Sequence, residues 1–366
     1  MVRDEAADAM LRVMREDFGN PSSTHYMGRR AADELTAARK KIADALGSQP
    51  NEIYFTSGGT EADNWAISGC AELLSRKGRH IITSAIEHDA VSGPIKKLEK
   101  KGWEATYLVP DNTGRISAEA FASALRDDTV FASVMLVNNE TGIVNPVNAY
   151  SGEIKRRRLG TILHTDAVQG FCKIPFSVKK LGADLATVSA HKIHGPKGVG
   201  ALYVRNGINL PPLFLGGGQE SGKRAGTEAL PAISGFGEAA RLGKTELETM
   251  SAAIRELREY TIRRLTAELP ETIIIGGDSP YILSMSLVGY KSEVLMSYLE
   301  GEGICVSKSA ACKKGARSKV LEAMRLRNEI IDGALRVSFS RFNTKDEAEY
   351  FVQSLKKASK TVFKAL

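Results

Sequence analysis

Short runs of β-branched and other apolar residues alternate with longer helical patterns over the first two thirds of the chain, and this alternation restricts the fold more than any other feature. The helical patterns include residues 29–46 and 60–77. Strands in alternation with helices form a mostly parallel sheet, so the sequence predicts an α/β domain. We expect buried strands at residues 52–56, 80–84, 105–109, 130–137, 161–164, 185–189 and 200–204.

A different pattern begins near residue 242. A long charged helical stretch is followed there by shorter strands and helices, which is typical of a smaller α+β domain. We therefore predict a large domain over residues 15–241 and a small domain over residues 242–366, with residues 1–14 packed on the small domain. The expected elements of the small domain are strands at 272–275, 282–287, 304–307 and 334–339 and helices at 244–269, 292–300 and 345–365.

The composition is that of a globular protein, with 43% hydrophobic and 25% charged residues. Lys and Arg number 50 and Asp and Glu number 43, so the net charge is +7, a mild excess that favours anionic ligands. Basic runs such as residues 155–158 are short and are not interleaved with aromatic residues. Nucleic-acid binding is therefore not expected.

The four cysteines form no C-x-x-C pair and have no histidine at ligand spacing, so we expect no metal site. The first 20 residues carry charges throughout, and the longest apolar run, residues 130–137, is too short to cross a membrane. We expect a cytoplasmic protein with free thiols and no membrane partner.

Small and polar residues follow the first predicted strand. Ser57-Gly58-Gly59-Thr60 forms a glycine-containing turn that opens a helix. The small residues let the backbone approach an anion, and the free N–H groups of the first helical turn could hold a phosphate. A simple strand-to-helix turn capped by Thr60 explains the same residues equally well.

Two charged residues follow other predicted strands. Asp166 comes at the end of a buried strand, where a carboxylate is costly unless a protonated pyridine nitrogen, an arginine or a helix cap compensates it. Lys192 lies among small residues and histidines, where it could be desolvated and reactive toward an aldehyde, although a loop lysine is more often exposed. Together with the phosphate-type turn, these residues form the set that a pyridoxal-phosphate site requires.

Five motifs that occur in order along the chain carry a resemblance to a known family. They are FGNPSSTH, TSGGTEADN, VNNETG, HTDAVQ and SAHKIHGPKGVGALYVR, and the resemblance extends from Asp17 to Arg341. The sequence closely resembles the cysteine desulfurases of the class V aminotransferase family. The resemblance implies fold type I of the pyridoxal-phosphate-dependent transferases, with a seven-stranded, mostly parallel sheet in the large domain. It also implies a homodimer with shared active sites.

The resemblance assigns cofactor-binding roles residue by residue. Lys192 matches the lysine that bonds to the aldehyde of pyridoxal phosphate, and Asp166 matches the partner of the ring nitrogen. His88 matches the histidine that stacks on the ring and takes part in catalysis, whereas without the family it would be interpreted as a helix-capping or core histidine. The expected phosphate contacts are Gly59, Thr60, Ser189 and His191, with Thr227 from the other subunit, and the expected contacts near the phenolic oxygen are Gln169 and Asn139, of which Asn139 also borders the substrate.

Two further residues match the family's substrate chemistry. Arg336 is similar to the arginine that grips the carboxylate of the amino acid, although a surface arginine on a strand edge is the alternative. Cys312 aligns with the nucleophilic cysteine of a loop. Cys70 and Cys305 lie in apolar periodic stretches and are expected to be buried packing residues, and the role of Cys172 is left open.

These assignments imply a cysteine desulfurase. L-cysteine would be the substrate, L-alanine the product, and a persulfide on Cys312 the sulfur source for an acceptor such as an iron–sulfur scaffold or a thiolation protein. A selenocysteine lyase or another class V enzyme is the second possibility. A catalytically impaired homologue that acts as a sulfur-relay or structural partner is the third.

The chain departs from the family pattern in two places. Ser309-Ala310-Ala311-Cys312 is followed by two lysines, where the family has Ser-Gly-Ser-Ala-Cys followed by Thr or Ser. The family's opening segment, L-D-x-A-A-T-T-P, has no counterpart in this sequence. Because that segment packs near the substrate in related enzymes, we expect its absence to slow alanine formation and to leave cofactor binding unchanged.

Overall fold

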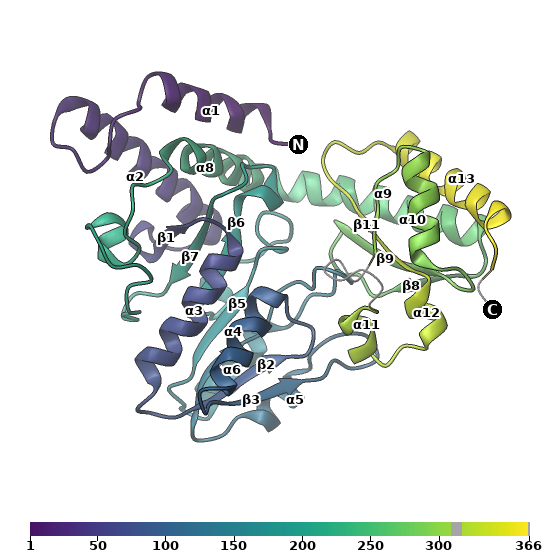
Figure 1. Cartoon of the computed structure of the whole chain (residues 1–366), viewed down its shortest axis with the longest axis horizontal. Helices are drawn as coiled ribbons and strands as arrows, with labels where there is room; N and C mark the ends of the chain where they lie inside the picture. The colour runs from purple at the N-terminus through teal and green to yellow at the C-terminus, as the bar shows by residue number, and fades with distance from the viewer. Residues whose placement is uncertain (309–316, 365–366) are drawn as a thin grey trace. The chain divides into compact units, whose positions relative to one another are not determined.

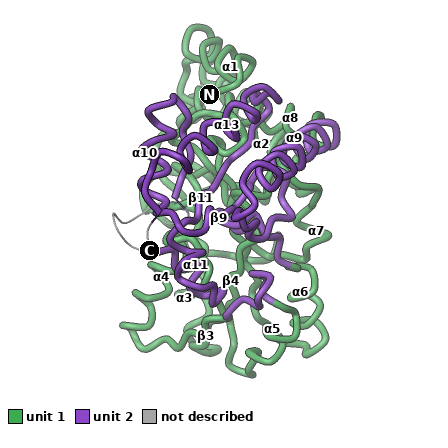
Figure 2. The backbone as a smooth tube through the Cα atoms, turned by 90° about the vertical axis from the view of Figure 1, so that its right-hand side faces the viewer, with its two compact units in different colours: residues 1–108, 117–136, 146–247 green, residues 109–116, 137–145, 248–366 purple. Residues whose placement is uncertain are grey.

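The computed structural model describes residues 1–308 and 317–364 (Figure 1). The chain forms two compact units, which Figure 2 colours separately. Because two short segments leave the first unit and return to it, neither unit is one continuous stretch of chain. The first unit comprises residues 1–108, 117–136 and 146–247, and the second comprises residues 109–116, 137–145 and 248–366.

A seven-stranded sheet forms the centre of the first unit in the described part of the chain. Its strands are β1 (Ile53–Thr56), β2 (His80–Ser84), β3 (Glu104–Leu108), β4 (Thr129–Ser133), β5 (Ile162–Asp166), β6 (Leu185–Ser189) and β7 (Gly200–Val204). The strand order is β1-β7-β6-β5-β4-β2-β3, and only β7 runs antiparallel to its neighbours among these strands. The prediction of an α/β fold with a seven-stranded, mostly parallel sheet is confirmed.

Helices surround this sheet (Figure 1). They are α1 (Asp4–Arg15), α2 (Tyr26–Leu46), α3 (Gly59–Leu74), α4 (Asp89–Glu99), α5 (Ala118–Ala124), α6 (Val147–Arg156), α7 (Val178–Leu181) and α8 (Leu230–Thr245), with 3-10 turns η1 (Pro50–Glu52), η2 (Ala190–Ile193) and η3 (Gln219–Gly222). The apolar side chains of α3, such as Trp65 and Ile67, are buried with those of α4 and the strands. This packing places the N-terminus of α3 at the end of β1.

Helix α1 belongs to the first unit. Its buried residue Val13 packs with Ala31 of α2 and Leu230 of α8. The backbone N–H of Arg3 also donates to the carbonyl oxygen of His194, at 2.8 Å. The sequence analysis placed residues 1–14 with the C-terminal domain, whereas the apolar face of α1 is buried against α2 and α8 because those helices offer it a matching apolar surface.

The second unit is built on a smaller antiparallel sheet. Its strands are β8 (Thr272–Ile275), β9 (Ile282–Leu287), β10 (Ser307–Lys308) and β11 (Ala334–Ser338), in the order β10-β11-β9-β8. Its helices are α9 (Leu247–Glu268, which begins at the last residue of the first unit), α10 (Ser292–Gly301), α11 (Lys319–Ala323), α12 (Asn328–Asp332) and α13 (Lys345–Thr361). Strands and helices thus follow the predicted order, although β10 is shorter than expected.

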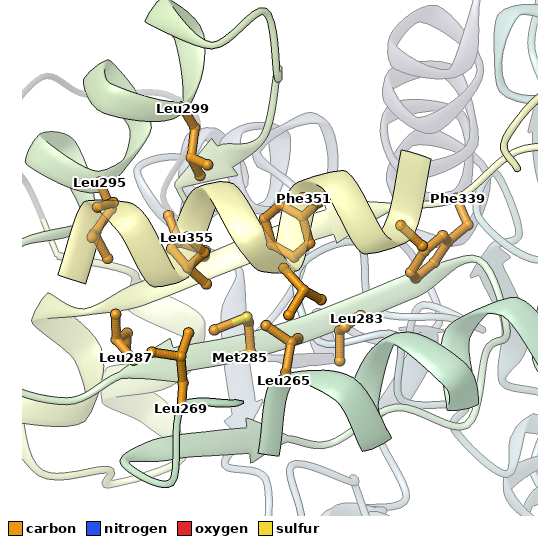
Figure 3. Packing of buried hydrophobic residues seen from close by; sticks show 14 of the residues in the cluster. Leu265, Leu269, Leu283, Met285, Leu287, Leu295, Leu299, Phe339, Phe351 and Leu355 are labelled. Atoms are coloured by element: carbon orange, nitrogen blue, oxygen red, sulfur yellow. The ribbon is translucent and has the colours of Figure 1, made fainter. Parts of the chain in front are cut away.

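Apolar side chains from the central strand and three helices form the core of the second unit. Leu283, Met285 and Leu287 alternate along β9 and therefore point to the same face of the sheet. Figure 3 shows them between Leu265 of α9 and Leu355 of α13. This core fixes β9 and its neighbour β11, which carries Arg336.

We predict that Leu283→Ala destabilises the protein by about 2–5 kcal/mol, because Leu283 is fully buried and its truncation leaves a cavity. Val294→Ala is the matched control: Val294 is 46% exposed on α10, so its loss should change the free energy of unfolding by less than about 0.5 kcal/mol. Urea unfolding followed by circular dichroism measures both. Equal losses in the two variants would contradict the central position of β9.

Candidate active site

The turns that follow β1 and β6 lie on either side of one glycine. Gly200 at the start of β7 pairs with Thr56 at the end of β1 and with Ser189 at the end of β6. A Cβ on Gly200 would lie 2.7 Å from the carbonyl oxygen of Val188 and 2.8 Å from the Cα of Gly58, so a larger residue does not fit. The close approach holds the predicted phosphate turn beside the segment that carries Lys192.

The N-terminus of α3 presents backbone N–H groups that an anion can bind. Gly58 is the N-cap and has no side chain to accept a hydrogen bond from the helix, and Gly59 and Thr60 occupy the first helical positions. Because α3 is 16 residues long, its dipole favours a negative charge at this end. The geometry at Gly59 and Thr60 therefore fits a phosphate group.

An ion pair next to this turn was not anticipated from the sequence. Glu61 accepts hydrogen bonds from Arg224 Nε at 2.9 Å, from Arg224 Nη2 at 3.2 Å and from the hydroxyl of Ser57 at 2.6 Å. Burial raises the pKa of Glu61, but these hydrogen bonds and the charge of Arg224 outweigh burial and lower it. Glu61 is thus ionised, and the positive charge of Arg224 compensates its negative charge. Glu61 lies in the TSGGTEADN motif quoted above, which was the available signal, whereas Arg224 lies outside the quoted motifs.

Asp166 ends β5 with its side chain 7% exposed to solvent. Its Oδ1 accepts a hydrogen bond from the backbone N–H of Val168 at 2.9 Å. Burial raises the pKa of Asp166, while the Val168 N–H and the positive charges of His88 and Lys192 act in the opposite direction. The structure therefore brings Asp166, His88 and Lys192 within electrostatic reach of one another.

Lys192 is half-buried in the η2 turn directly after β6. Two polar residues, Ser189 and His191, precede it. The buried Ser189 places its hydroxyl 2.9 Å from Nδ1 of His191. Burial lowers the pKa of His191, and the charge of Lys192 lowers it further, so a neutral imidazole is favoured. On the neighbouring segment, the Oε1 atom of Gln169 accepts a hydrogen bond from Lys173 Nζ at 2.9 Å.

His88 begins α4. Its Nδ1 accepts a hydrogen bond from the backbone N–H of Ala90 at 3.1 Å, so the residue acts as a helix cap, and it is exposed rather than part of the core. A cavity of about 410 Å³ opens between α3 and α4 and is lined by His88, Thr60 and Asn64. The cavity gives space beside the predicted phosphate turn and the predicted ring-stacking histidine.

Glu87 is a second carboxyl group that the sequence analysis did not single out, although it stands next to His88 in the A-I-E-H stretch. Its Oε1 accepts hydrogen bonds from the backbone N–H of Met135 at 3.0 Å and from the hydroxyl of Ser84. Its Oε2 is buried and has no hydrogen-bond partner among the described residues. Burial, with repulsion from Asp166, raises the pKa of Glu87 to about 8 although its hydrogen bonds oppose the shift.

Asn139 and Arg336 lie together in the second unit. Arg336 on β11 donates from Nη1 to the backbone carbonyl oxygen of Asn139 at 2.8 Å. Its Nε is buried and has no partner in the part of the chain that the structure describes. Burial lowers the pKa of Arg336, against the influence of Glu140, so the guanidinium would be stabilised by an anion. A carboxylate of a ligand fits this requirement.

Asn138 shapes the loop that presents Asn139. Its Oδ1 accepts hydrogen bonds from the backbone N–H groups of Glu140 and Thr141, at 3.0 Å and 2.9 Å. The backbone N–H of Gly142 donates to the carbonyl oxygen of Asn138, and Gly142 adopts a φ of 73°, which only glycine adopts without strain. The motif VNNETG therefore codes for a fixed turn.

The remaining predicted residues have different surroundings. Thr227 is exposed in the first unit, after the η3 turn. Cys312 lies outside the described residues. Cys70 is buried, as expected, but the expectation for Cys305 was wrong, because Cys305 is exposed in the segment that precedes β10. Burial raises the pKa of Cys172 to about 12, so its thiol stays protonated near neutral pH.

Two structural features are absent from residues 1–308 and 317–364. Those residues contain no group of three or more histidine, cysteine, aspartate or glutamate side chains that could hold a metal ion. They also include no helix that is long and apolar enough to span a membrane.

Comparison with known proteins identifies the family. The aminotransferase class V profile matches residues 1–351. A cysteine desulfurase IscS from Methanosarcina thermophila is 43% identical over 95% of this chain and 87% of its own length, and one from Dictyoglomus turgidum is 41% identical over 97% and 91%. Among solved structures, a NifS-like protein superposes with a TM-score of 0.93 at 37% identity, covering 99% of this chain and 97% of its own.

The chain therefore belongs to the class V aminotransferase family, whose members depend on pyridoxal phosphate. Within that family its relatives are cysteine desulfurases, as the sequence motifs indicated. The residues present fit the cofactor: the N-terminus of α3 suits its phosphate, and the buried Asp166 suits a protonated ring nitrogen. The cofactor prediction is confirmed, whereas the role of each site residue stays a prediction.

We predict that Glu87→Gln changes how stability depends on pH in the full-length protein without cofactor. In the unfolded chain Glu87 releases its proton near pH 4.5, whereas in the native protein it keeps the proton until about pH 8. The native state thus binds more protons between these values, and wild-type stability is lost as pH rises through this window. Because one pKa unit corresponds to about 1.4 kcal/mol, we expect the variant to gain a few kcal/mol at most relative to wild type.

Urea unfolding at pH 5, 6, 7, 8 and 9 measures this difference. Glu256→Gln, at an exposed position on α9, is the control and should follow the wild type at every pH. If the difference between Glu87→Gln and wild type were constant over the whole range, Glu87 would not retain its proton in the native protein.

Proposed function

We propose that this protein removes sulfur from L-cysteine, releases L-alanine and holds the sulfur as a persulfide on Cys312. One observation carries the proposal: a buried acid, Asp166, and a half-buried lysine, Lys192, follow adjacent strands beside a helix N-terminus suited to phosphate. This is the arrangement that pyridoxal-phosphate chemistry on an amino acid needs.

Pyridoxal phosphate, when bound, supplies an aldehyde that bonds to amino groups and a ring that accepts electrons from the substrate. Lys192 would hold the cofactor through its aldehyde in the resting enzyme, and once the substrate amino group has displaced it, its freed Nζ could take a proton from the substrate Cα. Asp166 holds the proton at the ring nitrogen. His88 would lie against the ring, and Ser189 and His191 would hold the phosphate together with the backbone of Gly59 and Thr60.

Arg336 binds the carboxylate of L-cysteine. What supports this role is its buried Nε, which has no hydrogen-bond partner within the described residues, and its Nη1, which the carbonyl oxygen of Asn139 holds at 2.8 Å. A guanidinium group oriented in this way gives a carboxylate two parallel hydrogen bonds. The pair would orient the substrate, and Asn139 would border it.

Cys312 accepts the sulfur. Its thiolate attacks the substrate Sγ, the Sγ–Cβ bond breaks, and the bonding electrons stay with Cβ, which then takes up a proton to give alanine. Lys313 and Lys314 follow in the sequence; their positive charge would favour a thiolate at Cys312, and a solvated charged loop is the alternative role. Cys172 and Cys70 suit this role less well, because Cys172 stays protonated and Cys70 is buried.

A second copy of the chain and a sulfur acceptor are the expected partners. Leu215 is 89% exposed and Phe214 is 47% exposed, in the loop that Arg224 ties to Glu61 and that leads to Thr227. An exposed apolar pair on an anchored loop favours burial against a second copy, where Thr227 would reach the phosphate of the other subunit. The acceptor would be a cytoplasmic protein such as an iron–sulfur scaffold.

We expect Lys192→Ala to lower alanine formation by at least about 100-fold, because Lys192 both bonds the cofactor and moves the Cα proton. Borohydride reduction of the wild-type holoenzyme, followed by peptide mapping, should attach the cofactor to Lys192. Lys197→Ala, at an exposed position five residues later, should keep the attachment and the activity. Cofactor found on Lys197 would overturn the assignment.

We expect Cys312→Ser to bind pyridoxal phosphate normally and to lose alanine and sulfide formation from L-cysteine by about 1,000-fold or more, because a serine hydroxyl cannot accept the sulfur. Alkylation of the wild-type enzyme during turnover should trap a persulfide on Cys312. Cys305→Ser is the control and should remain active. Undiminished turnover by Cys312→Ser would assign the nucleophile to Cys172 or to an external thiol.

A further inference from the structure

A row of polar side chains lies under α3 in the first unit. His164 of β5 is fully buried, with Nδ1 at 2.8 Å from the hydroxyl of Ser133 on β4 and Nε2 at 3.0 Å from the hydroxyl of Thr187 on β6. Asp63 of α3 completes the row: its side chain is 2% exposed, and its Oδ1 lies 3.6 Å from His164 Nε2. Thr187 also hydrogen-bonds to Asp63.

This row lies directly behind Asp166. His164 and Asp166 are two residues apart on β5, so their side chains share one face of the sheet, and Thr187 is the residue of β6 that pairs with Asp166. Asp63 therefore approaches from the helix toward the same face that presents Asp166. One turn earlier on α3 lie Gly59 and Thr60, the predicted phosphate contacts.

The charges around Asp63 are unfavourable for a carboxylate. Asp166 and Glu87 face it and are both acidic, and His164 is not a compensating cation, because burial lowers the pKa of His164 to about 3. The Oδ1 of Asp63 has no hydrogen-bond partner closer than its long contact with His164 among the described residues. Burial, followed by the repulsion by Asp166, raises the pKa of Asp63 well above its usual range.

We propose that Asp63 is a positioning residue that stays a neutral acid and ties the phosphate-binding end of α3 to the strand that carries Asp166. A neutral carboxyl group can donate to or accept from Thr187, and His164 and Ser133 continue the row across three strands. The row would fix the spacing between the two protein groups that hold opposite ends of the cofactor. Because Asp63 is neutral, Asp166 remains the carboxylate that holds the proton at the ring nitrogen.

This proposal rests on the pyridoxal-phosphate site, but not on the desulfurase reaction. Asp63→Asn is the conservative variant, because an amide can replace a neutral acid as donor and acceptor. Asp63→Leu removes both functions and leaves Thr187 and His164 without their partner. A negatively charged Asp63 and a neutral Asp63 therefore predict different behaviour for the asparagine variant.

The first measurement is infrared spectroscopy of the full-length holoenzyme at pH 7, in a Glu87→Gln background that removes the carboxyl group of Glu87, whose pKa is also raised. We expect the carbonyl stretch of a protonated carboxyl group in Glu87→Gln and its loss in the double variant Asp63→Asn, Glu87→Gln. Identical spectra of the two proteins would show that Asp63 is ionised and would overturn the proposal.

The second measurement is the affinity for pyridoxal phosphate and the pH titration of its bound absorbance. Asp63→Asn should match the wild type in both, because no charge is lost near Asp166. Asp63→Leu should bind the cofactor about 10- to 100-fold more weakly, since buried hydrogen-bonding groups lose their partner. Circular dichroism identifies a leucine variant that fails to fold, and the asparagine variant then decides alone.

A shift of the absorbance titration in Asp63→Asn would show that a negative charge had been removed, and it would contradict the proposal. If the protein bound the cofactor but did not remove sulfur from cysteine, the expected infrared and absorbance results for the Asp63 variants would stay the same. The failure of this proposal and the failure of the proposed function are therefore distinguishable.

Discussion

The buried carboxyl group of Asp166 is the feature on which the arrangement of the first unit depends. A carboxylate that is 7% exposed loses most of its hydration, and the Val168 N–H, His88 and Lys192 compensate only part of that loss. In the proposed site a positively charged ring nitrogen would supply the remaining compensation, because a buried charge is stable when it is paired. One acidic residue at a strand end thus favours a protonated pyridine ring over a neutral ligand, as the proposed site requires.

Helix α3 serves this site at several levels. Its first residues offer backbone N–H groups to a phosphate, and its next residue, Glu61, is neutralised by Arg224 so that it does not repel the anion. Asp63 faces the sheet, and the apolar residues that follow bury the helix against the strands. Because all these groups lie on one helix, the packing of its apolar face also determines where the predicted phosphate site lies.

The second unit obtains its predicted substrate-binding residues from separate stretches of the chain. Residues 137–145, one of the two short segments that leave the first unit, supply Asn139. Strand β11 supplies Arg336 nearly 200 positions later. A division into two continuous domains at residue 242 cannot describe this arrangement. The two segments, residues 109–116 and 137–145, belong to the second unit because their side chains interact with residues there. Arg115, for example, forms an ion pair with Asp278 at 2.5 Å.

The sequence by itself determined the order and type of the elements, since β-branched runs and helical periodicity are local properties. Strands β6, β7, β8 and β9 have the predicted limits. Residues 134–137 were predicted as strand because they continue an apolar run; they are buried, but β4 ends at Ser133. The motifs also identified the family and its cofactor. Only the tertiary structure decided that Cys305 is exposed, that Glu61 meets Arg224 and that Asp63 and Glu87 are buried near Asp166. Burial and long-range pairing are set by elements far apart in the chain, and the local pattern of residues carries no information about the distance between them.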